Sequence, residues 1–81
     1  MPIIYVNINI EVFYMNKFQE RLKLLRVERG LRQADIAKLV NVHQVTYQGW
    51  EKGKSQPDID KIIAIADYYK VSTDYLLGRY N

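Results

Sequence analysis

Residues 33–52, with the sequence QADIAKLVNVHQVTYQGWEK, decide the fold predicted for this chain. Apolar residues recur at helical spacing on both sides of Asn41. Ala37 is small enough for two helices to cross closely at its position. Asn41 tolerates the left-handed backbone of a tight turn better than most residues other than glycine. The stretch therefore predicts two short helices, over about residues 33–40 and 43–52, which meet at a sharp angle.

Each of these two helices has an apolar side and a polar side. The side predicted to face the core carries Ile36, Val40, Val42, Tyr47 and Trp50. The opposite side of the second helix carries His43, Gln44, Val45, Thr46 and Gln48. A solvated helix usually carries Lys and Glu at such positions. Gln can hydrogen-bond adenine N6 and N7, Thr can bond a base or a phosphate, and Val can contact a thymine methyl group. This polar side therefore predicts contact with base edges in the DNA major groove.

Helical spacing continues before and after this stretch. The residues Phe18, Leu22 and Leu25 predict a first helix between Asn16 and Gly30. A fourth helix follows Pro57, and its apolar residues are predicted to form a core stripe: Ile59, Ile62, Ile63, Ala66 and Tyr69. A last short helix, with Tyr75 and Leu76, follows Ser72 and ends at Gly78. The predicted fold class is all-α, a compact domain of five helices.

The first residues of the chain have a different pattern. Residues 2–14 alternate between apolar and polar side chains, which predicts an extended strand. A lone strand leaves its backbone groups unpaired, so its expected partner is the same strand in a second copy of the chain. The sequence Met15-Asn16-Lys17 also resembles a natural start, and residues 1–14 are then an extension. Both interpretations stay open, with an N-terminal arm over residues 1–15 and a folded domain over residues 16–81.

Composition limits the classes of function. The chain has 81 residues and no cysteine, which indicates one small domain in a reducing compartment, the cytoplasm. No apolar run approaches the ~20 residues of a membrane helix. Residues 15–54 hold nine basic and four acidic side chains, whereas the flanking segments are close to neutral. A basic block of this kind suits a polyanion-binding face. The sequence has no nucleophile triad, phosphate-cradling glycine loop or metal-ligand cluster, so neither an enzyme nor a cofactor, metal ion or small-molecule ligand is expected.

Four short motifs give the chain a resemblance to a known family. They are residues 33–37 (QADIA), 50–55 (WEKGKS), 57–59 (PDI) and 71–78 (VSTDYLLG). Together they make residues 18–78 similar to the Cro/CI-type helix-turn-helix proteins, also called the XRE family, of phage repressors and bacterial regulators. The resemblance implies a lambda-repressor-like fold.

The resemblance also implies roles for individual residues. In similar proteins the glutamine that opens the second helix binds a DNA phosphate, and Gln33 occupies this place. The early positions of the third helix read bases, which implies base contacts for Gln44 and Val45. An arginine of the first helix pairs with the glutamate near the end of the third, and Arg26 and Glu51 are expected to form this structural ion pair.

Further DNA contacts are expected from the residues themselves. The base-contacting set then consists of His43, Gln44, Val45, Thr46 and Gln48. The phosphate-contacting set consists of Arg32, Gln33, Lys54 and Ser55. Two positions depart from the family pattern: Asn41 replaces the usual turn glycine, and Gly49 lies inside the third helix, where relatives carry larger polar residues. A helical glycine costs about 1 kcal/mol of helix propensity. Either Gly49 only removes a contact, or it lets the helix approach DNA closely.

The sequence therefore leads to two hypotheses. The first is a homodimeric transcriptional regulator, in particular a repressor, that binds a double-stranded DNA operator and dimerises through residues 3–14. The second is an interaction module with the same fold, such as an antitoxin that holds a partner protein.

Overall fold

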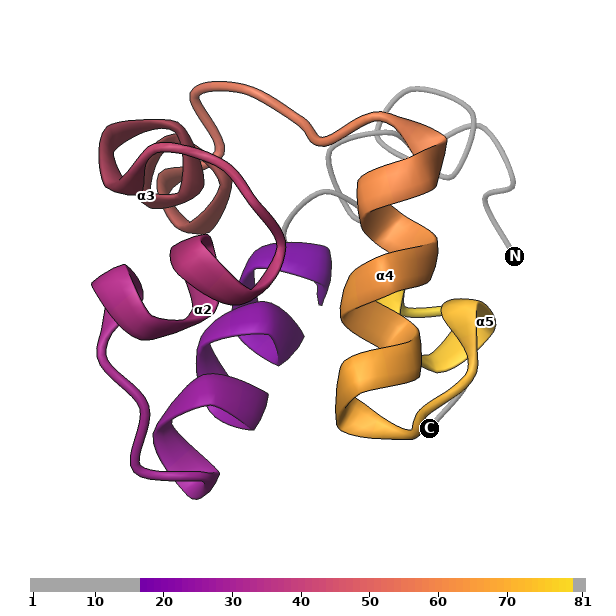
Figure 1. Cartoon of the computed structure of the whole chain (residues 1–81). Coiled ribbons are helices and arrows are strands. Elements are labelled where there is room, and N and C mark those ends of the chain that lie inside the picture. The colour runs from indigo at the N-terminus through magenta and orange to yellow at the C-terminus, as the bar shows by residue number, and fades with distance from the viewer. Residues whose placement is uncertain (1–16, 80–81) are drawn as a thin grey trace.

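A computed structural model of the protein describes residues 17–79, which form five helices and no strand. The first helix spans residues 17–28. The next four are α2 (Gln33–Leu39), α3 (Gln44–Lys52), α4 (Ile59–Tyr69) and α5 (Thr73–Leu76), as Figure 1 shows. The predicted five-helix, all-α fold is confirmed. The predicted N-terminal strand lies outside the described residues.

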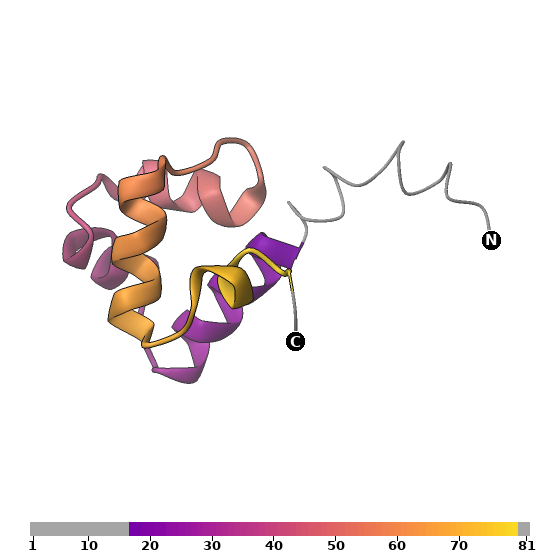
Figure 2. The ribbon, with the colours of Figure 1, turned by 90° about the vertical axis from the view of Figure 1, so that its right-hand side faces the viewer.

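The helices surround one core. In Figure 1, α2 and α3 lie on one side, α4 and α5 lie on the other, and the first helix runs below and between them. Figure 2 shows α5 beside the start of the first helix. There, Arg21 Nη1 donates to the carbonyl oxygen of Tyr75 across 2.7 Å. Within residues 17–79, no helix combines the length and apolar character needed to cross a membrane.

The core consists of apolar side chains from all five helices. The buried members are Phe18, Leu22, Leu25, Ile36, Ala37, Val40, Tyr47, Trp50, Ile65, Ala66, Tyr69 and Leu76. Burial of a large apolar side chain contributes about 1.5–3 kcal/mol, and this set is the main favourable term for so small a domain. The core residues predicted for the first three helices are in this set, apart from Val42, which packs against it half-buried.

Local chemistry sets the helix ends. Asp58 Oδ1 accepts from the Lys61 N–H at the start of α4, and Ser72 Oγ accepts from the Tyr75 N–H at the start of α5, each across 3.0 Å. These side chains satisfy backbone donors that have no partner within the helix. Helix α3 is followed by Gly53, whose φ of 76° lies in the left-handed region that favours glycine.

The prediction for α4 was wrong in part. Ile59 and Ile63 are 72% and 45% exposed, whereas Ile65, which the predicted stripe left out, is fully buried. The buried side of α4 is centred on Ile65, Ala66 and Tyr69. Successive residues of a helix turn by about 100°, which places Ile59, and still more Ile63, away from the centre of this side.

Candidate nucleic-acid interface

The turn between α2 and α3 is a tight backbone structure. The Val42 N–H donates to the Ala37 carbonyl oxygen across 2.9 Å, and the Asn41 N–H donates to that of Lys38 across 3.1 Å. These two bonds form the Schellman motif, which requires a left-handed residue just after the helix. Asn41 supplies it with a φ of 61°. Asparagine thus replaces the expected glycine without opening the turn, and only four residues, 40–43, separate α2 from α3.

Helix α3 has one buried side and one exposed side. Tyr47 and Trp50 are buried in edge-to-face contact, with ring centroids 5.8 Å apart. The predicted base-contacting residues lie mostly on the other side: His43, Gln44, Val45 and Thr46 are exposed, and Gln48 is half-buried. Val45 is 73% exposed. Helix α3 lies at an edge of the molecule in both Figure 1 and Figure 2, so its polar side is accessible to a large ligand.

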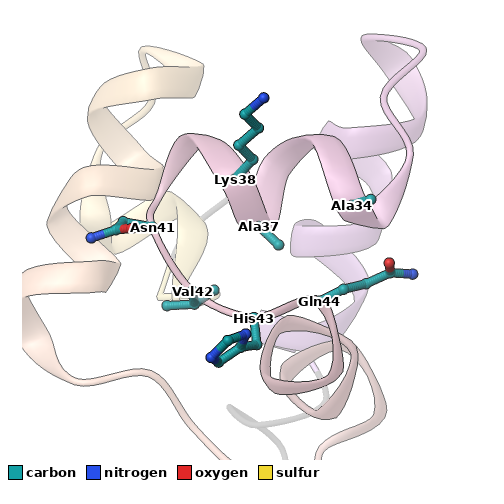
Figure 3. A pocket seen from close by; sticks show the side chains of 7 residues that line it. All are labelled: Ala34, Ala37, Lys38, Asn41, Val42, His43 and Gln44. Atoms are coloured by element: carbon teal, nitrogen blue, oxygen red, sulfur yellow. The ribbon is translucent and has the colours of Figure 1, made fainter.

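A hollow of about 390 Å³ adjoins the start of α3. Its lining consists of Ala34, Ala37, Lys38, Asn41, Val42, His43 and Gln44. Figure 3 shows His43 and Gln44 at the start of α3, next to α2, from which Ala37 points toward α3. None of the lining residues is acidic. The surface next to Gln44 is therefore concave and free of negative charge.

Behind the polar side of α3, the carboxylate of Glu51 joins three helices. It accepts from Arg26 Nε at 2.7 Å, Arg26 Nη2 at 3.1 Å, Gln33 Nε2 at 3.1 Å and the Tyr47 hydroxyl at 2.5 Å. The Glu51 and Arg26 side chains are only 5% and 13% exposed. Arg26 also donates to the Leu31 carbonyl oxygen across 2.9 Å. The Arg26–Glu51 pair thus fixes the first helix, the start of α2 and the end of α3 relative to one another.

The pKa values of this cluster follow from the same contacts. Burial alone raises the pKa of Glu51, but hydrogen bonds from Arg26, Tyr47 and Gln33 outweigh it, and the pKa lies below its ordinary value. The hydrogen bond to Glu51 raises the pKa of Arg26. Burial, followed by the bond to Glu51, raises the pKa of Tyr47. At neutral pH the ion pair is charged and the phenol is neutral.

The position of Gln33 modifies its predicted role. A carboxylate only accepts hydrogen bonds, so the amide nitrogen of Gln33, and not its oxygen, faces Glu51. The amide oxygen then faces elsewhere and cannot bind a phosphate, which also only accepts. One amide hydrogen of Gln33 is donated to Glu51. The second amide hydrogen is the one that this side chain would donate to a phosphate.

The other predicted phosphate contacts differ in their surroundings. Arg32 is exposed and donates to Asp35, with 3.0 Å between Arg32 Nη2 and Asp35 Oδ1. Lys54 and Ser55 are exposed in the loop after α3, and their N–H groups donate to the Gly49 carbonyl oxygen across 2.9 and 3.4 Å. A Cβ atom on Gly49 would lie 3.0 Å from Ser55 Oγ. Gly49 therefore lies next to the Ser55 hydroxyl group, a contact that the sequence did not indicate.

Sequence reasoning also missed Lys61. Its ammonium nitrogen donates to the carbonyl oxygen of Val40 across 2.8 Å, from the first turn of α4 to the end of α2. Lysine in the first turn of a helix is electrostatically unfavourable, because the positive end of the helix dipole lies there. This local mismatch was the only available signal of a long-range contact.

Two helices that meet at a tight turn, with the second one exposed along a polar side, define a helix-turn-helix protein. Residues 22–76 match the family model described as Helix-turn-helix. The chain therefore belongs to the helix-turn-helix family, and the resemblance to Cro/CI-type repressors is confirmed.

Several relatives agree with this assignment. The chain is 35% identical to the HTH-type transcriptional regulator ImmR of Bacillus subtilis over 60 residues, which cover 74% of this chain and 47% of ImmR. It is 33% identical to repressor protein C2 of Salmonella phage P22 over 58 residues, which cover 72% of this chain and 27% of that repressor. The chain thus spans half or less of the length of these relatives.

Solved structures give the same result. A transcriptional regulator from Listeria innocua is 39% identical and superimposes with a TM-score of 0.75, over 79% of this chain and 60% of that one. The P22 c2 repressor in complex with a synthetic operator is 31% identical with a TM-score of 0.71, over 75% of this chain and 92% of that one.

Proposed function

We propose that this protein is a sequence-specific transcriptional regulator, in particular a repressor, that places α3 in the major groove of double-stranded DNA. The observation that carries the proposal is the exposed side of α3. Gln44, Val45 and Thr46 are exposed there, while Tyr47 and Trp50 anchor the other side in the core. A rigidly held helix with short polar side chains suits the readout of base edges.

The comparisons support the same function. ImmR is named a transcriptional regulator, C2 of phage P22 is named a repressor, and the c2 structure contains an operator. In this proposal Gln44 is the principal base contact, with Val45 against a thymine methyl group. His43, Thr46 and Gln48 are secondary base contacts, while Gln33, Arg32, Lys54 and Ser55 bind backbone phosphates.

The proposed assembly on DNA is a homodimer. Two copies of α3 about 34 Å apart would read the two halves of a pseudo-palindromic site in successive major grooves. The proposed contact between copies is the N-terminal arm, residues 3–14, which precedes the folded domain. Phosphate contacts would make the affinity strongly salt-dependent, because each releases condensed counterions from the DNA.

Selection of bound duplexes from random DNA tests the function. The expected result is a sequence motif with two related halves, and a stoichiometry of two chains per duplex. The same measurement without residues 1–14 tests the arm, since its loss should leave a monomer in solution. Binding without sequence preference would contradict the proposal, and a stable complex with another protein in place of DNA would favour the antitoxin-like alternative.

A further inference from the structure

We infer that Lys61 is a positioning residue for DNA recognition, which acts by fixing the turn that aims α3. The inference rests on the proposed function for its effect on DNA, and on the structure alone for its effect on the turn. Lys61 lies on α4, and its Nζ donates to the Val40 carbonyl oxygen across 2.8 Å.

The end of α2 explains why this bond matters. The last carbonyl groups of a helix have no partner within it and need one from elsewhere. In α2, the Ala37 and Lys38 carbonyl oxygens accept from Val42 and Asn41 within the turn. The Val40 carbonyl oxygen accepts from the Lys61 ammonium group instead. The positive charge also faces the negative end of the α2 dipole, so the bond is charge-assisted.

At the start of α4, a hydrogen bond from its own backbone fixes the position of Lys61. Asp58 Oδ1 accepts from the Lys61 backbone N–H across 3.0 Å, so the residue is fixed in the first turn of the helix. Farther along α4, Ile65, Ala66 and Tyr69 are buried in the core. Lys61 therefore lies on a helix that is anchored in the core, and its long side chain reaches the carbonyl oxygen of Val40.

The consequence for recognition follows from the shortness of the turn. Only Val40 and the three residues after it separate Leu39, the last residue of α2, from Gln44, the first residue of α3, so a shift of the Val40 carbonyl group moves the start of α3. A small rotation at this point moves the side chains that face the base edges. Base contacts have strict geometry, whereas phosphate contacts from flexible cations tolerate such a shift. Loss of the Lys61 bond should therefore reduce specific binding more than non-specific binding.

The experiment compares Lys61→Met with Lys61→Arg and with Lys23→Met, which removes the same charge from an exposed site on the first helix. Each protein is titrated against the duplex selected for the unaltered protein and against a scrambled duplex of equal length. All titrations use one salt concentration and a temperature at which every variant is folded. A second measurement, without DNA, follows the backbone amide signals of Asn41, Val42 and Gln44 by nuclear magnetic resonance.

Lys61→Met should lose about tenfold in affinity for the selected duplex, the equilibrium effect of one hydrogen bond to a charged group. Its affinity for the scrambled duplex should match that of Lys23→Met. Lys61→Arg, which still donates to a carbonyl, should recover most of the loss. The amide signals of the turn should shift in Lys61→Met and stay in place in Lys23→Met. If Lys61→Met does not fold, Lys61→Gln takes its place, with a smaller loss expected.

Three results would overturn the inference. In the first, the selected and scrambled duplexes lose affinity equally, which makes Lys61 a phosphate contact. In the second, Lys61→Met retains its preference for the selected duplex. In the third, the amide signals of the turn do not move. Absence of any preference in the unaltered protein would instead refute the proposed function, and the amide signals would still decide whether Lys61 fixes the turn.

Discussion

The hydroxyl group of Tyr47 donates to Oε2 of Glu51 across 2.5 Å, one turn farther along α3. Tyr47 is fully buried, and this bond satisfies its only polar group. The bond also completes the set of donors around a carboxylate that holds three helices together. Helix α3, with its exposed polar side, is thus held in place by a polar cluster and not by apolar packing alone.

A pair of tyrosine substitutions should have opposite effects on stability. Tyr47→Phe leaves a Glu51 oxygen without one of its donors, and should lower the free energy of unfolding by about 1–2 kcal/mol. Tyr69 is equally buried, but its hydroxyl has no partner in the part of the chain that the structure describes. Tyr69→Phe removes that unsatisfied group and should leave stability unchanged or raise it by up to about 1 kcal/mol. Urea unfolding of both variants measures the difference, and equal losses would contradict it.

The ion pairs Arg26–Glu51 and Arg32–Asp35 should differ strongly in their contribution to the free energy of unfolding. Arg26→Ala leaves Glu51 buried without its cation, and should cost about 3–5 kcal/mol of folding free energy. Arg32→Ala removes an exposed pair with Asp35, which salt and solvent screen, and should change the melting temperature little. Thermal unfolding at low and high salt makes the comparison. A large, salt-dependent loss for Arg32→Ala would contradict the assignment of the Arg26–Glu51 pair as the structural one.

Gln44→Ala separates base contact from backbone contact. Gln44 is exposed at the start of α3, so its truncation should shift the melting temperature by no more than about 2–4 °C. A bidentate base contact is worth about 1–3 kcal/mol, so affinity for the selected duplex should fall about tenfold or more. Gel-shift titrations on selected and scrambled duplexes provide the measurement. Equal losses on both would reassign Gln44 to the DNA backbone.

The helix-turn-helix was predictable because its determinants are local. Apolar spacing, the small Ala37 and the turn-tolerant Asn41 all lie within residues 33–52, and the φ of 61° at Asn41 follows from its own chemistry. The exposure of Gln44 and the burial of Trp50 follow from the same helical period. Patterns of this kind require no knowledge of distant segments.

The partners of Gln33, Lys61 and Gly49 were not predictable on the same basis. Gln33 and Glu51 are 18 residues apart, and Lys61 and Val40 are 21 residues apart. Such contacts depend on how whole helices pack. The buried side of α4 was predicted wrongly for a related reason. Isoleucines at 59, 63 and 65 fit more than one helical face, and only the position of α4 on the core selects Ile65.

Gly49, inside α3, and Gly53, directly after it, should respond oppositely to substitution by alanine. Gly49 lies within the helix, and an added Cβ would meet only the rotatable hydroxyl of Ser55 at 3.0 Å. Gly49→Ala should therefore gain helix propensity, up to about 1 kcal/mol. Gly53 has a φ of 76°, and an added Cβ would lie 2.2 Å from the Gln19 amide nitrogen. Gly53→Ala should lose about 1–2 kcal/mol from its left-handed backbone alone.

A double variant isolates the cause at Gly53. Gln19→Ala removes the side chain that the new Cβ would meet, but it does not change the backbone conformation. Gln19→Ala with Gly53→Ala should therefore recover only the part of the loss that comes from the close contact. Full recovery would show that the left-handed backbone carries no cost, and a stabilising Gly53→Ala would contradict the packing of the first helix against this turn.

Stability should fall on both sides of neutral pH, for different reasons. The pKa of Glu51 in the folded protein lies below its ordinary value of 4.5, so its contribution is present above pH 4.5 and is lost as pH falls through the folded value. Burial raises the pKa of Tyr69 to about 12 from 10.0, and the pKa of Tyr47 is also raised. Their contributions are complete below pH 10 and decline as pH rises further, because the unfolded chain ionises first.

The loss of stability at alkaline pH gives the more specific test, because it can be assigned to one residue. Between pH 10 and 12, Tyr69 alone should account for about 2 kcal/mol of lost unfolding free energy, since one pKa unit corresponds to 1.36 kcal/mol. Tyr69→Phe has no phenol to ionise at this position, so its unfolding free energy should fall less steeply over the same range. Urea unfolding at a series of pH values measures both slopes. Parallel slopes would mean that the Tyr69 hydroxyl is not held in its neutral form by burial.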